Sequence, residues 1–145
     1  MSASFRLAPL GPAVLELVGQ ARGGLATAAT ATVPAERYTA AHLAALRAAT
    51  AVLAVRARPV RSHRPRSVWA VLPRVAPELT EWAAFFAASA RRRAAVEGGL
   101  GHVISPRDAD DLLRDADTFV GAVAETLGVP HQQRLAGAVV AFLGR

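Results

Sequence analysis

Arg37 and His42 are the two residues whose types and spacing best suit acid–base chemistry on a phosphate. A histidine can take up or release a proton near neutral pH, and an arginine can stabilise charge that develops on phosphate oxygens. The functional interpretation of the pair is therefore RNA cleavage, with His42 taking or giving the proton. Residues five apart lie about 140° apart around a helix, so the two converge only if Arg37 folds back or two helices meet across a dimer. From spacing alone, a surface arginine and a hydrogen-bonded histidine is the simpler interpretation.

Tyr38 lies four residues before His42, a spacing that places both on one helix face and makes Tyr38 a candidate supporting group. The decisive observation is where His42 points. Projection of Arg37 and His42 into one solvent-accessible groove favours a nuclease. Burial of His42 against Trp82 or Phe86, or a hydrogen bond in the core, excludes that role.

Two further interpretations of the same helix remain open. In the first, the protein is a non-catalytic interaction module, and the face carrying Tyr38, Ala41 and His42 meets a second copy or a protein partner. In the second, a small molecule or nucleotide binds between the second and fifth predicted helices, with Arg47 and Asp110 at the edge of the pocket.

A basic segment covers residues 58–66 and reads RPVRSHRPR, with two prolines, four arginines and no acid. Every basic residue of the chain is arginine and the net charge is +6, which favours a polyanionic partner. A solvated linker is the alternative, and Arg58 and His63 repeat the Arg37–His42 spacing, so that spacing is common in an arginine-rich chain. The candidate RNA contacts are Arg47, Arg56, Arg58, Arg61, Arg64 and Arg66.

Asp108, Asp111 and Asp115 share one helix face and could bind a hard divalent cation. Complementation of the helix dipole and pairing with arginines explains them more simply. The chain has no cysteine, which excludes disulfides and thiolate metal sites. We expect no metal and no cofactor.

The elements that must position these residues are all helical. Alanine and leucine dominate the apolar residues, and no stretch has the alternation of a half-buried strand. Prolines at helix starts and glycines at helix ends predict an up-and-down bundle of about five helices within a single domain, residues 1–145. Their predicted ranges are 12–31, 34–57, 68–75, 77–97 and 106–127, with a short last helix over 130–143.

Two apolar groups are predicted to form the core of the bundle. One is the stripe of Leu43, Leu46, Thr50 and Leu53 on the second helix, and the other is the aromatic cluster of Trp82, Phe85 and Phe86. The longest uncharged apolar runs are far shorter than the roughly 20 residues of a membrane span. No signal peptide is recognisable, so a cytoplasmic protein that does not enter a membrane is expected.

Three long segments resemble a small actinobacterial family of HEPN-domain proteins. They read ERYTAAHLAALRAATAVLAVRARP, SVWAVLPRVAPELTEWAAFFAASARRRAAVEGG and RDADDLLRDADTFVGAV, and the resemblance covers roughly residues 12–128. It implies a helical bundle, often dimeric. Many HEPN domains are metal-independent endoribonucleases that use an Arg and a His, four to six residues apart, facing a cleft at the dimer interface. Others have lost that activity and bind RNA or nucleotide, or act as partners in stress and toxin–antitoxin systems.

Carried over to this chain, the resemblance implies Arg37 and His42 as catalytic residues and Tyr38 as their support. In the well-studied ribonucleases of the superfamily the pair lies on a late helix, whereas here it opens the second. The alternative is that the Arg37–His42 pair is a structural signature of this branch of the HEPN superfamily instead of an active site.

Overall fold

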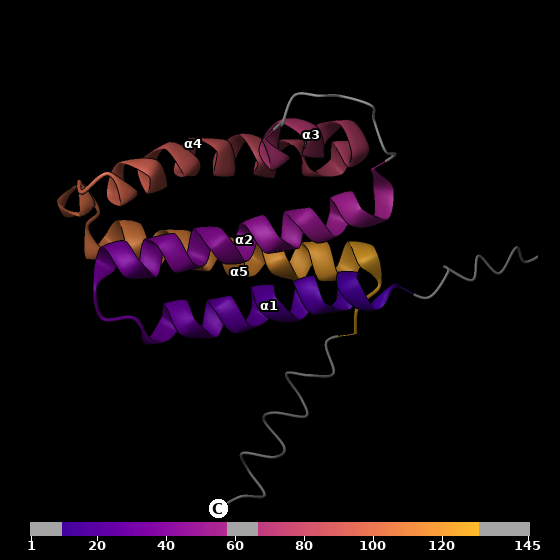
Figure 1. The fold of residues 1–145 in the computed structure, drawn as a ribbon, viewed down its shortest axis with the longest axis horizontal. Coiled ribbons are helices and arrows are strands. Elements are labelled where there is room, and N and C mark those ends of the chain that lie inside the picture. The colour runs from indigo at the N-terminus through magenta and orange to yellow at the C-terminus, as the bar shows by residue number, and fades with distance from the viewer. Residues whose placement is uncertain (1–9, 58–66, 131–145) are drawn as a thin grey trace, which may run out of the picture.

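A computed structural model of the chain describes residues 10–57 and 67–130, and these form five α-helices and two short 3-10 turns with no strand among them (Figure 1). The helices are α1 (Pro12–Thr30), α2 (Pro34–Arg56), α3 (Val68–Val75), α4 (Thr80–Glu97) and α5 (Pro106–Leu127), and the 3-10 turns cover Pro77–Leu79 and Gly101–Val103. The all-α prediction is confirmed. The predicted fourth helix is a 3-10 turn followed by α4, and the last predicted helix and the basic segment 58–66 lie outside the described residues.

Helix ends follow the predicted signals. Proline occupies the first turn of α1, α2 and α5, where its missing N–H removes no hydrogen bond. Ser105 and Asp108 form a reciprocal capping box at the start of α5. Gly128 ends α5 with φ of 71°, a left-handed conformation that glycine adopts without strain.

α2 is the central helix and packs against α1, α3, α4 and α5 (Figure 1). Its most deeply buried positions are mostly alanine, with Ala41, Ala45 and Ala48 fully buried. The small side chains let neighbouring helices approach closely, and at Gly24 of α1 a Cβ would lie 3.3 Å from the Cβ of Ala44. By length and composition α2 could also span a membrane, but half of that stretch is buried inside the bundle, as a core helix requires.

Burial corrects both predicted core groups. On α2 the leucines of the predicted stripe are only partly buried and flank the alanines, which occupy the centre. In the aromatic cluster Phe86 is fully buried and Trp82 partly buried, but Phe85 is 41% exposed. The centre of the core joins Phe86 to Trp69 of α3 and Phe119 of α5, with ring centroids 5.1 and 5.0 Å from that of Phe86.

Candidate functional site

Arg37 lies in the first turn of α2 and holds the end of α1. Its Nε donates a hydrogen bond to the carbonyl of Ala28 at 3.3 Å, and Nη2 donates to the carbonyl of Ala31 at 2.6 Å. Nη1 forms an ion pair with Asp110 of α5. A cation at a helix C-terminus is favoured by the helix dipole and by otherwise unpaired carbonyls. Arg37 therefore joins α1, α2 and α5.

His42 lies in the core and is 1% exposed. Its ring meets Trp69 and Phe86 edge-on, with centroid distances of 5.8 and 6.3 Å. Its side chain makes a polar contact with Ser89 of α4, where Nδ1 lies 2.7 Å from the hydroxyl oxygen. The imidazole is therefore enclosed by side chains of α3 and α4 and has almost no contact with solvent.

The hydrogen bonds of Ser89 fix the tautomer of His42. The Ser89 hydroxyl donates to the carbonyl of Phe86 at 3.0 Å, so its oxygen accepts the hydrogen on Nδ1 of His42. Burial, and to a smaller extent the positive charge of Arg93, lowers the pKa of His42 from 6.5 to about 4. The imidazole is therefore neutral near physiological pH and held as a structural donor.

Tyr38 is also buried, and it reaches the same part of α4 as His42. Its hydroxyl donates a long hydrogen bond of 3.5 Å to the carbonyl of Ser89, and burial raises its pKa. The guanidinium of Arg92 lies 5.6 Å from the centroid of the Tyr38 ring and pairs with Asp108 at 2.9 Å. The prediction that Tyr38 and His42 share a helix face is confirmed, and that face points inward.

The structure does not bring Arg37 and His42 together. Arg37 contacts α1 and α5, whereas His42 contacts α3 and α4. Within the chain the two side chains therefore do not project into one solvent-accessible groove. The interface predicted on Tyr38, Ala41 and His42 is wrong for the same reason, because all three pack inside the bundle.

The predicted RNA contacts divide between described and undescribed residues. Arg56 at the end of α2 pairs with Glu78 and donates to the carbonyl of Val75 at 3.3 Å. Arg47 is partly buried and makes no ion pair within residues 10–57 and 67–130. The remaining four, Arg58, Arg61, Arg64 and Arg66, lie outside the described residues.

The aspartates at the start of α5 take part in helix capping and ion pairs. Asp108 accepts from the backbone of Ser105 and from Arg92, and these contacts lower its pKa. Asp111 pairs with Arg114 at 3.6 Å. Within the part of the chain that the structure describes, no group of three or more His, Cys, Asp or Glu side chains could hold a metal ion.

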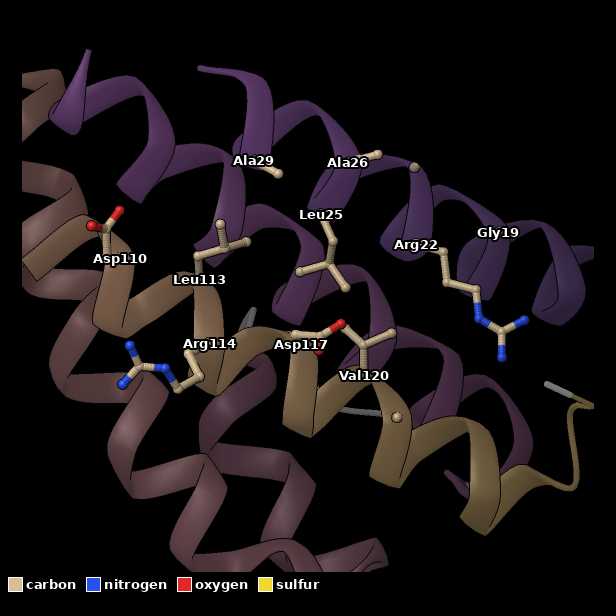
Figure 2. A pocket seen from close by; sticks show the side chains of 12 residues that line it. Gly19, Arg22, Leu25, Ala26, Ala29, Asp110, Leu113, Arg114, Asp117 and Val120 are labelled. Atoms are coloured by element: carbon tan, nitrogen blue, oxygen red, sulfur yellow. The ribbon is translucent and has the colours of Figure 1, made fainter. Parts of the chain in front are cut away.

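Among the grooves of the described bundle, two border α5. The smaller, about 370 Å³, lies between α4 and α5 beside Tyr38, Phe85 and Arg92. The larger, about 930 Å³, lies between α1 and α5 and is called the α1/α5 groove below (Figure 2). Asp110 borders the larger groove, while Arg47, its predicted companion at a ligand pocket, borders neither.

Sequence reasoning missed Ser89 and the shared location of Gly19, Gly23 and Gly121. Nothing in the spacing of Ser89 marks it as the partner of a histidine 47 residues earlier. The glycines did carry a signal, because each lies inside a helix, where glycine is unfavourable. Only the structure shows that all three border one groove.

The all-α bundle agrees with the class that the family comparison gives, the HEPN-domain proteins. More particularly, the model of the SAV_6107-like HEPN family matches residues 28–124, and the chain belongs to that family. Comparison with curated proteins and with solved structures gives no match. The predicted HEPN resemblance is confirmed.

Proposed function

We propose that this HEPN protein acts in the cytoplasm as a non-catalytic interaction module. The observation that carries the proposal is the buried hydrogen bond between His42 Nδ1 and the Ser89 hydroxyl. A general acid or base must lie within hydrogen-bonding reach of the substrate proton. His42, at 1% exposure, is shielded from substrate by Trp69 and Phe86.

The electrostatics support the same conclusion. An efficient proton-transfer catalyst has a pKa near the working pH, whereas the pKa of His42 is lowered to about 4. Arg37, the predicted phosphate ligand, is already bound to two carbonyls of α1 and to Asp110. Each member of the pair thus has a structural role with partners on other helices.

The test is cleavage of labelled single-stranded RNA in EDTA by the full chain. We expect no turnover by the wild type above a buffer control, and no difference between the wild type and His42→Gln. Arg74→Ala, at an exposed position of α3, is the control variant for a contaminating nuclease. Metal-independent cleavage that His42→Gln or Arg37→Ala abolishes, with helix content retained by circular dichroism, would show that the protein is an endoribonuclease.

A second function, binding of RNA without cleavage, is favoured by the distribution of charge. Residues 10–57 and 67–130 hold ten arginines and all eleven acids, so the described bundle is nearly neutral. The seven other arginines lie outside it, four of them in residues 58–66. We propose that Arg58, Arg61, Arg64 and Arg66 supply the phosphate contacts. Replacing these four with serine should abolish binding of single-stranded RNA measured by fluorescence anisotropy.

A further inference from the structure

The α1/α5 groove is an elongated surface between two helices that pack against α2. Leu25 from α1 and Leu113 and Val120 from α5 supply its apolar side chains (Figure 2). Along α5 the groove extends from Asp110 to Gly121. At the usual helical rise this stretch is about 17 Å long, so a helix that fills the groove needs about three turns.

Three residues that border the groove are helical glycines that packing among the described residues does not explain. A Cβ added at Gly19, Gly23 or Gly121 would meet nothing within 4 Å. Glycine in a helix interior is nevertheless less favourable than alanine. Gly24 is the contrasting case, because a Cβ there would lie 3.3 Å from the Cβ of Ala44 of α2. Glycine on an exposed helix face permits close approach of another backbone, so the three glycines favour an occupant that lies close to both walls of the groove.

The described part of the chain ends beside this groove, at Pro130. The backbone N–H of Val129 donates to the carbonyl of Ala124 at 2.8 Å, the hydrogen bond that closes a Schellman motif around Gly128 and turns the chain at the end of α5. The carbonyl of Pro130 then accepts from Nη1 and Nη2 of Arg22, both at 3.5 Å, and Arg22 borders the groove. Residue 131 therefore follows directly from the rim of the groove.

The residues after Pro130 have the length and the composition of an occupant. Residues 131–145 read HQQRLAGAVVAFLGR, and a short helix is predicted over 130–143. A helix of that length measures about 20 Å, close to the length of the groove. Four apolar residues of the segment have the i, i+3, i+4 and i+7 spacing of one helix face, Leu135, Ala138, Val139 and Phe142. This apolar face matches the apolar side chains of the groove.

The covalent connection at the rim favours this segment over a separate molecule. An element tethered next to its site is present there at an effective concentration on the order of millimolar. A helix that turns back after α5 runs antiparallel to α5, from the end of the groove at Arg22 towards the end at Ala29 and Asp110. Both the concentration and the direction follow from where Pro130 lies.

We propose that residues 131–145 of this chain pack into the α1/α5 groove as a helix, with their apolar face on the leucines and the valine of the groove. The inference goes beyond the proposed function and does not depend on it. It assigns this face of the bundle to the chain's own segment, so a partner reaches the groove only when the segment is displaced.

The first test locates the segment in the full chain. Because the chain has no cysteine, Ala29→Cys gives a single attachment point for a nitroxide label at an exposed position at the far end of the groove. In NMR spectra of the isotope-labelled protein, we expect the nitroxide to broaden the amide signals of residues 139–143 more than those of residues 131–134. Ala84→Cys, at an exposed position of α4, is the matched control and should broaden both groups much less.

Three outcomes of the labelling experiment overturn the proposal. Signals of residues 139–143 that respond equally to the two labels show that the segment does not occupy the groove. Broadening of residues 2–9 instead assigns the groove to that segment. Broadening in a mixture of isotope-labelled wild type and unlabelled nitroxide-bearing protein places the segment in the groove of a second copy.

The second test fills the groove. Gly23→Leu places a bulky side chain on the groove face of α1, and Ala84→Leu adds the same side chain at an exposed position of α4. We expect amide hydrogen exchange of residues 135–143 to become about tenfold faster in Gly23→Leu and to stay unchanged in Ala84→Leu. Circular dichroism should show that α1 is retained, since Gly23 has open space. Unchanged exchange in Gly23→Leu would contradict the close approach of the segment to α1.

Discussion

The imidazole of His42 is buried in the bundle, and its Nδ1 has a hydrogen-bond partner in the hydroxyl of Ser89. Ser89 accepts from Nδ1 of His42 and donates to the Phe86 carbonyl, so the hydrogen bonds of this part of the core close within two helices. No buried side-chain nitrogen or oxygen lacks a partner in the described parts of the chain. A buried polar group without a partner would destabilise the fold by about 1–3 kcal/mol, which explains why the pair is complete.

His42 should make stability depend on pH in one window. The unfolded chain binds a proton at this ring below pH 6.5, whereas the folded chain binds it only below about pH 4. Between these values the unfolded state holds more protons, so the free energy of unfolding rises with pH. The stabilisation that neutral His42 provides is therefore lost as pH falls from 6.5 to about 4. The full effect is on the order of 3 kcal/mol.

The measurement is urea denaturation of the wild type and of His42→Gln at a series of pH values. The glutamine side chain retains a donor for Ser89 but cannot titrate, so the difference between the two free energies should shrink as pH falls from 6.5 towards 4. Parallel pH profiles for the two proteins would contradict the burial of a neutral His42. The carboxylates Glu78 and Asp108, whose pKa values are lowered, contribute equally to both proteins and cancel.

At the scale of the elements, Arg37 explains how α1 is held at its C-terminal end. The last turn of α1 contains no basic residue. Arg37 supplies a positive charge there from the next helix and donates to the carbonyls of Ala28 and Ala31, and Asp110 on α5 fixes the guanidinium. An arginine with five donors in one plane suits three such acceptors better than lysine does.

Arg37→Ala should therefore lower the free energy of unfolding by about 2 kcal/mol, since hydrogen bonds from charged groups contribute about 1.5–3 kcal/mol and this side chain is partly exposed. Arg37→Lys should recover only part of the loss. Arg47→Ala on the same helix is the matched control and should change stability by less than about 0.5 kcal/mol. Equal effects of the two alanine variants in urea denaturation would contradict this role of Arg37.

At the scale of the whole molecule, the excess of positive charge lies outside residues 10–57 and 67–130. The pI of about 11.5 comes from arginines outside residues 10–57 and 67–130, while the described helices carry nearly equal numbers of both signs. Polyanion binding by this protein should therefore depend on the segment 58–66, and the arginines of α4 should matter little.

This separation predicts the salt dependence of RNA binding. Replacing Arg58, Arg61, Arg64 and Arg66 with serine should make the slope of log K against log salt shallower by about 3, the value for four phosphate contacts to a single strand. Replacing Arg91 and Arg93 of α4 with serine removes two charges from the bundle and should change the slope by less than about 1. Similar slopes for the two variants would contradict a dedicated basic segment.

The sequence by itself determined the helices and their ends. Pro12, Pro34, Ser105 and Gly128 act through backbone conformation and hydrogen bonds within a few residues, so their effect can be predicted without knowing the fold. The HEPN resemblance was recoverable for the same reason, because long segments of the chain carry it. Hydrophobic periodicity wrongly placed the buried face of α2 on its leucines. The buried alanines of α2 face several neighbouring helices, so this helix has no single apolar stripe.

Only the tertiary structure decided what Arg37 and His42 do. Their types and spacing suit phosphate chemistry, but five residues on a helix send the side chains to different neighbours. α1 and α5 surround Arg37, and α3 and α4 close over His42. The solvent access and protonation of these two residues depend on those neighbours, which come from distant parts of the chain. The groove between α1 and α5, which three helical glycines border, likewise exists only because distant segments pack together.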